Sequence, residues 1–240
     1  MLVYVGVALV VAVATCAQVL SGFGFALVAI PLVALLAGAK SAVVGMALVG
    51  PLLTAAVVLR DRGEIRWRTA ATFTAAALLG MPAGILVLGR AGDRALKAII
   101  GVIVVAAGVA LWRGLRVPPG RRSELIAGVL SGVLATSTGT NGPPLVIVLH
   151  SESLEPRQFR GTLSASFLAQ GVVALGAFWV SGHVTADAAR VAASALPGIG
   201  VGWFLGDHLF KGMEKERFGA IVLVMLVLSG LVSAVSALVR

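Results

Sequence analysis

The sequence predicts an all-α protein that crosses the membrane several times; its composition, its segment lengths and the placement of its glycines support that fold class. Of its 240 residues, 59% are hydrophobic and only 12% are charged, too few charged side chains to cover a water-soluble globule of this size. Its 30 glycines are spread through the apolar runs, as in membrane helices that pack closely against their neighbours. We therefore expect the lipid bilayer to surround the chain, with no separate water-soluble domain.

The basic residues lie in short gaps between the apolar runs. A formal net charge of +9 would suit a protein that binds nucleic acid, but this placement instead indicates control of membrane orientation beside anionic lipid headgroups. Cys16 is the only cysteine, so neither a disulfide framework nor a cysteine metal site is expected. Residues 1–20 have no basic stretch before their apolar run and no cleavage site, so we interpret them as a retained membrane element.

Two of the predicted membrane segments are too long to be single helices. A straight helix over residues 2–37 would be about 54 Å long, against roughly 30 Å for the hydrocarbon core. It must break at SGFGF, residues 21–25, and the segment 124–150 must break at TSTGTNGPP, residues 136–144, because glycine and proline interrupt helices. The eight predicted segments are residues 2–37, 41–59, 69–89, 95–112, 124–150, 161–180, 187–206 and 217–239.

The two broken segments open two sequence-related halves, residues 1–117 and 118–240. We interpret the halves as an internal duplication, and an insertion of four residues then aligns residues 96–105 with 218–227. Glycine-rich faces serve equally within and between chains, so the sequence leaves a homodimer open. Glycines pair between the halves at offsets of 117 to 119 residues: Gly22 with Gly139, Gly63 with Gly182, Gly80 with Gly198, and Gly84 with Gly202.

The distribution of Arg and Lys between the loops distinguishes two topologies. If each broken segment crosses the membrane once, eight spans result and the basic residues divide 9 to 10 between the two faces. If each broken segment is a re-entrant hairpin, the halves are inverted and one face carries 13 basic residues against 6. The second distribution has the strong bias expected of a cytoplasmic face and favours inverted repeats, a common plan in transporters. That face comprises the loops at residues 60–68, 113–122, 151–160 and 207–217.

The two helix breaks are the best candidate for a binding site. Inside hydrocarbon, a non-helical stretch is tolerated only where it is buried in protein or lines a cavity, and two matching breaks indicate one shared site. Each restarting helix has unpaired N–H groups in its first turn, whose natural partner is an anion. The alternative is that the glycines only permit a kink or a helix crossing. The predicted substrate-binding residues are Gln18, Ser21, Gly22, Phe23, Gly24, Phe25, Thr138, Gly139, Thr140, Asn141, Gly142, Pro143 and Gln170.

Several of these residues have a second interpretation. Pro143 suits the first turn of a restarting helix, where its missing N–H is no loss, so we expect it to have a geometric role. Phe23 and Phe25 either form a wall of the cavity or simply pack against neighbouring helices. Gln18 and Gln170 lie inside apolar runs, where a side-chain amide must either bond across helices or face water.

No catalytic or metal site is expected. An HExxH zinc pair, a Walker loop and a dinucleotide fingerprint are all missing, so we predict neither an enzyme nor a cofactor. The Asp and Glu residues lie at segment ends or in loops, where no buried carboxylate pair is evident. His150 is either a titratable group near a break or an ordinary interfacial histidine. Arg157 and Arg160 either attract anions to the second break or mark the cytoplasmic face.

Two motifs resemble a known transporter family. The stretches SGFGFALVAIPL, residues 21–32, and SGVLATSTGTNGPPLVIVL, residues 131–149, are similar to the repeat-opening motifs of the TauE/SafE sulfite exporter family. The resemblance covers essentially the whole chain. It implies a multi-pass secondary transporter of the bacterial inner membrane that moves sulfite, organosulfonates or related small sulfur-containing anions, coupled to an ion gradient. Phe23 and Phe25 stand where many relatives carry a fuller glycine cluster, which implies a bulkier or differently shaped substrate than sulfite.

The leading functional prediction is therefore a secondary transporter, acting as an exporter, that binds a small anion between the two breaks. A passive anion channel built on the same breaks is the alternative. A membrane scaffold that transports nothing is less consistent with the polar residues Thr138, Thr140 and Asn141 in the second break.

Overall fold

The computed structural model describes residues 2–152 and 154–210, and this part of the chain is helical, without strands. Both long segments are divided into two helices at the predicted breaks. The last predicted segment, 217–239, lies outside the described residues. The described helices are α1 (Leu2–Ser21), α2 (Gly24–Ala37), α3 (Ala39–Asp61), α4 (Trp67–Arg90), α5 (Asp93–Trp112), α6 (Arg121–Ser137), α7 (Gly142–Ser151), α8 (Pro156–Val180) and α9 (Ala186–Phe210).

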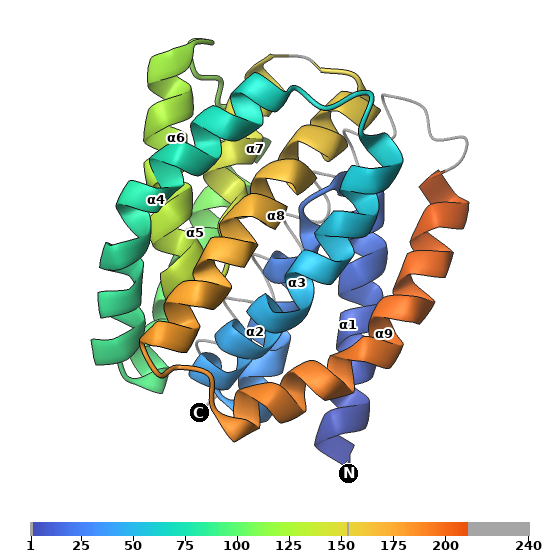
Figure 1. Ribbon diagram of the computed structural model, residues 1–240, viewed down its shortest axis with the longest axis vertical. Coiled ribbons are helices and arrows are strands. Elements are labelled where there is room, and N and C mark those ends of the chain that lie inside the picture. The colour runs from blue at the N-terminus through green and yellow to red at the C-terminus, as the bar shows by residue number, and fades with distance from the viewer. Residues whose placement is uncertain (1, 153, 211–240) are drawn as a thin grey trace.

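The first break is the turn of a helical hairpin formed by α1 and α2. Gly22 follows α1 with a φ of 84°, a conformation that favours glycine, and its amide still donates to the Gln18 carbonyl at 2.7 Å. α2 then runs back along α1, so that Leu36 near its end lies against Gly6 near the start of α1. Both outer ends of this hairpin therefore lie at the same end of the helix bundle (Figure 1).

A second hairpin, formed by α6 and α7, opens at the opposite end of the bundle. Gly139 supplies the turn with a φ of 69°, and Pro143 and Pro144 occupy the first turn of α7, where proline is well tolerated. At the outer end, the amide of Val117 before α6 donates to Oγ of Ser151, the last residue of α7, at 3.1 Å. Oppositely opening hairpins are what the re-entrant topology requires; they support inverted halves, which stay a prediction.

The described parts of the loops predicted to share the more basic face meet at one end of the bundle, which we call the basic end. Arg60 at the end of α3 is paired with Asp207 of α9, and Arg66 before α4 is paired with Glu152 after α7. The hydrogen bond from the Val117 amide to Ser151 brings the loop before α6 into this group as well. At the opposite end, the start of α3 is hydrogen-bonded to the start of α5. The charge distribution thus predicted which loops lie together.

Two parallel helix pairs flank the bundle, and glycines permit their close contact. α4 lies beside α6, and α9 lies beside α1 (Figure 1). A Cβ on Gly80 of α4 would overlap the backbone at Val129 of α6, and a Cβ on Gly202 of α9 would overlap the backbone at Ala12 of α1. Contacts between small residues of this kind hold membrane helices together.

The glycine contacts of the two pairs are alike. A Cβ on Gly84 of α4 would overlap the Val133 carbonyl and the Thr136 side chain of α6, and a Cβ on Gly202 of α9 would overlap the Ala12 carbonyl and the Thr15 side chain of α1. The internal duplication and its pairing of glycines stay predictions.

α3 and α8 lie at the centre of the bundle, between the two flanking pairs (Figure 1). They run antiparallel, because Asp61 at the end of α3 bonds to Arg160 in the first turn of α8, and Pro51 of α3 lies against Gly171 of α8. Five described helices, α1, α3, α4, α8 and α9, are long and apolar enough to cross a membrane, whereas α2 and α7 are shorter. The described part is consistent with a multi-pass membrane protein; the number of spans stays a prediction.

We predict that Gly202→Ala lowers the unfolding temperature of the detergent-solubilised protein, whereas Gly200→Ala on the same helix does not. A Cβ at Gly202 would overlap Ala12 and lie 2.7 Å from Cβ of Thr15, but a Cβ at Gly200 meets nothing within 4 Å. Such overpacking destabilises by about 1–3 kcal/mol, while alanine is the better helix former. Equal unfolding temperatures for the two variants would contradict the close contact between α1 and α9.

Candidate functional site

A cavity of about 90 Å³ lies between the tips of the two hairpins. A single water molecule needs roughly 10–15 Å³, so the cavity has room for a small anion. Its walls come from the end of α1 with the first break, from α2, from the middle of α3, from the second break with its flanking helices, and from the middle of α8. Six predicted site residues line it: Gln18, Phe23, Phe25, Gly139, Asn141 and Gly142.

Gln18 replaces hydrogen bonds that the first break removes. Its side-chain Oε1 accepts from the Phe25 amide at 3.1 Å, and its Nε2 donates to the Gly22 carbonyl at 2.8 Å. Gln18 is 2% exposed and also lines the cavity. It therefore combines the two roles that the sequence left as alternatives, the bond between segments and the wall of a cavity. An anion that approaches the Phe25 amide must displace this side-chain oxygen.

The second break is held by a polar cluster of Ser131, Asn141 and Gln170. Nδ2 of Asn141 donates to Oε1 of Gln170 at 2.9 Å. The Ser131 hydroxyl lies 2.9 Å from the same oxygen and 3.0 Å from the Asn141 carbonyl. Gln170 is fully buried, and its Nε2 has no hydrogen-bond partner among the described residues. Because an unpaired buried donor is costly, this amide is suited to bond a water molecule beside Asn141, although Gln170 itself does not line the cavity.

The cavity is polar at the two breaks but carries no side-chain charge, since no Arg, Lys, His, Asp or Glu of the described residues lines it. α2 and α7 both begin beside it, and a helix N-terminus carries a partial positive charge of about half an elementary charge. The two helix ends differ, because Pro143 and Pro144 remove two amide donors from the first turn of α7. At the second break, the backbone therefore offers fewer donors than at the first, while the side chain of Asn141 lines the cavity.

Two threonines of the second break bond to each other and do not line the cavity. The hydroxyls of Thr138 and Thr140 are 2.8 Å apart and bond to each other, and the Thr138 hydroxyl also donates to the Leu134 carbonyl at 3.3 Å. The side chain of Ser21 lies outside the described part of the structure. The contribution of Thr138, Thr140 and Ser21 to binding stays a prediction. The predicted residues that do not line the cavity are Gly22, Gly24, Thr138, Thr140, Pro143 and Gln170.

The structure adds walls that the sequence did not indicate. Met46 and Thr54 of α3 and Phe167 of α8 line the cavity. Thr54 is 7% exposed, and its hydroxyl donates to the Gly50 carbonyl of its own helix at 3.1 Å. These residues lie within continuous helices, where no break marks them. The one local signal is a proline inside α3, at position 51, which also lines the cavity.

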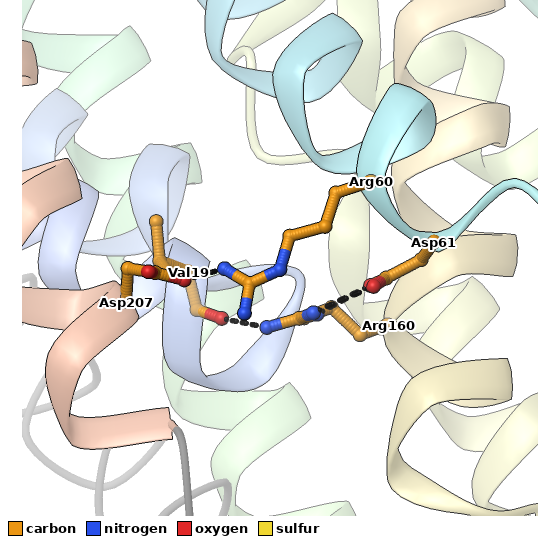
Figure 2. Close-up of polar contacts among 5 residues, drawn as sticks. All are labelled: Val19, Arg60, Asp61, Arg160 and Asp207. Carbon is orange, nitrogen blue, oxygen red and sulfur yellow. Dashed lines mark hydrogen bonds and ion pairs between the residues drawn. The ribbon is translucent and has the colours of Figure 1, made fainter.

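Arg160 lies beside the first break, whereas one of its two sequence-based interpretations placed it at the second. Its side chain is 1% exposed, bonds to Asp61 and donates to the Val19 carbonyl at 2.8 Å (Figure 2). His150 and Arg157 are exposed, and neither lines the cavity. No cluster of His, Cys, Asp and Glu in the described ranges could hold a metal ion.

Comparison with protein families gives a match over nearly the whole chain. The family described as Sulfite exporter TauE/SafE matches residues 7–233. This range includes both hairpins and agrees with the motif resemblance at residues 21–32 and 131–149. No curated protein and no solved structure matches the chain. The chain therefore belongs to the sulfite exporter TauE/SafE family of membrane transporters.

Proposed function

We propose that this protein is a secondary transporter that exports an organosulfonate or a related small sulfur-containing anion, which it binds between the two hairpin tips. The observation that carries the proposal is that two helix breaks, far apart in the sequence, line one cavity. Membership of the TauE/SafE family supports membrane transport of a sulfur oxyanion.

The polar part of the lining favours an oxyanion headgroup. Two helices begin beside the cavity, and their positive N-terminal ends stabilise negative charge. Gln18 and Asn141 add side-chain amides at the two breaks. Because no Lys or Arg of the described residues lines the cavity, an anion is held by neutral donors only. Such moderate binding suits transport, since the anion must also leave.

The apolar part of the lining favours an anion with a hydrocarbon tail. Phe23, Phe25 and Phe167 line the cavity together with Ile30 and Met46. Inorganic sulfite has no apolar surface to bury against them, whereas an alkanesulfonate gains about 0.8 kcal/mol for each buried methylene. We therefore place organosulfonates ahead of sulfite itself as substrates.

The contact between the two breaks favours a carrier over an anion channel. A Cβ on Gly142 would lie 3.7 Å from Cβ of Phe23, so the two hairpin tips are close to van der Waals contact beside the cavity. In a carrier, one half moves against the other around a fixed site. Movement of one tip at a time would then expose the cavity to one side of the membrane at a time.

We predict that Gly142→Leu abolishes anion transport in proteoliposomes, whereas Gly176→Leu on α8 does not. Gly142 lines the cavity, and a Cβ there would lie 3.6 Å from the Phe167 ring, so the rest of a leucine side chain would occupy the space of the substrate. A Cβ at Gly176 meets nothing within 4 Å. Normal uptake of a labelled alkanesulfonate by a folded Gly142→Leu variant would disprove the proposed site.

The substrate class is tested by a series of 1-alkanesulfonates of increasing chain length. We expect transport efficiency to rise by about fourfold for each added methylene, the equivalent of 0.8 kcal/mol, until the cavity is full. Phe167→Ala should shift the optimum to a longer chain, because removing the ring enlarges the apolar part of the cavity. The measurement is competition against a labelled substrate in proteoliposomes. A preference for sulfite over every alkanesulfonate would contradict the proposal, and downhill flux that never saturates would favour the channel.

A further inference from the structure

Arg160 forms a buried ion pair with Asp61 at the basic end, beside the first break (Figure 2). Nε of the guanidinium donates to Oδ2 of Asp61 at 2.7 Å, and Nη2 donates to Oδ1 at 2.8 Å. The two residues are only 1% and 5% exposed. This bidentate geometry is the strongest arrangement of an arginine and a carboxylate. It joins the end of α3 to the first turn of α8, and so one proposed half to the other.

The same arginine holds the tip of the first hairpin. Its Nη1 donates to the Val19 carbonyl at 2.8 Å, within the last four residues of α1, where carbonyls lack helical amide partners. A cation at this place also suits the negative C-terminal end of the helix. The turn itself lies on Arg160, because a Cβ on Gly22 would be only 2.8 Å from Cα of Arg160.

A neighbouring residue of α8 reaches the break as well. Phe159 packs edge-on against Phe23, with 6.5 Å between the ring centroids and 74° between the ring planes. Phe23 also lines the cavity, so it has the cavity on one side and the first turn of α8 on another. The first break therefore lies between the cavity and the buried ion pair.

The second break has no comparable ionic support in the part of the chain that the structure describes. A Cβ on Gly139 would meet Ile30 and Val43, and the Thr136 hydroxyl donates to the Met81 carbonyl at 2.7 Å. The other described ion pairs join helix ends or loops at the basic end, or lie within single helices. One hairpin tip is thus held by apolar packing and neutral hydrogen bonds, and the other by a buried ion pair.

We propose that Arg160 is a latch residue, which together with Asp61 holds the first hairpin tip closed toward the basic end. The anion then passes between the cavity and that end only when this contact opens. Asp61 already neutralises the guanidinium, so Arg160 positions the tip and does not bind the anion. Because a buried charge is costly without its partner, the ends of α1, α3 and α8 must rearrange together. The inference rests on the proposed role of the cavity but concerns access, whatever the substrate.

The test is the accessibility of a single cysteine in the cavity. In a Cys16→Ala background, Ala26→Cys places a thiol on the cavity wall, and a membrane-impermeant methanethiosulfonate is applied to either side of sealed vesicles without substrate. A separate Gly63→Cys variant, at a site with nothing within 4 Å, identifies the side that carries the basic end. We expect Arg160→Gln/Asp61→Asn to accelerate labelling from the basic end about tenfold, a modest population shift, and to leave the other side unchanged.

A matched control removes a different ion pair at the same end. Arg66→Gln/Glu152→Gln neutralises a pair between the α3–α4 and α7–α8 loops, and we expect it to label like the parent protein. If the double variant does not fold, Arg160→Lys still pairs with Asp61 but cannot also keep the fork geometry and the Val19 contact. A smaller acceleration is then expected.

Three results would overturn the latch: an unchanged labelling rate in a folded variant, an equal rise from both sides, or the same rise in the control variant. These results are independent of the proposed function, because labelling needs no substrate. A protein that transports alkanesulfonates but shows unchanged labelling would keep its proposed function and lose the latch. Accelerated labelling in a protein that transports no alkanesulfonate would keep the latch and overturn the proposed function.

Discussion

The structure depends on one constraint, that backbone N–H and C=O groups exposed by a break in a membrane helix must find partners inside the protein. At the first break the Gln18 side chain supplies them, with bonds to the Phe25 amide and the Gly22 carbonyl. At the second break, the Ser131 hydroxyl is the partner of the Asn141 carbonyl, and Gln170 holds the Asn141 side chain. Gln18 and Asn141 line the cavity as well as support the breaks, so under the proposed function the substrate must compete with or extend these bonds.

Each hairpin is supported by a helix from the other proposed half. α1 packs on α9, and α6 packs on α4, through glycine contacts that bring the backbones together. α3 and α8 fill the centre and contribute the side walls of the cavity. Under the proposed carrier mechanism, these contacts couple a movement of either hairpin to the opposite half, as alternating access requires. The two tips differ in what holds them, because only the first is fixed by a buried ion pair in the described part of the chain.

The sequence predicted the features that carry a local signal. Glycine and proline interrupt a helix in any tertiary context, so they marked the two breaks. The excess of Arg and Lys in four loops predicted the basic end. No such signal marked the side walls of the cavity. Met46 and Phe167 lie in regular apolar helices, whose sequences are alike whether a residue faces lipid or a cavity. Arg160 and Asp61 are 99 residues apart and lie near segment ends, where charges are usually solvated.

The most direct test of a shared site between the two breaks is a structure determined with a bromine-substituted alkanesulfonate bound. We expect the anomalous bromine signal among the apolar walls of the cavity, near Phe167, with the sulfonate density between Gln18 and Asn141. Bromine and sulfonate density at another place, such as beside Arg160, or an empty cavity in a protein that demonstrably binds the compound, would contradict the account.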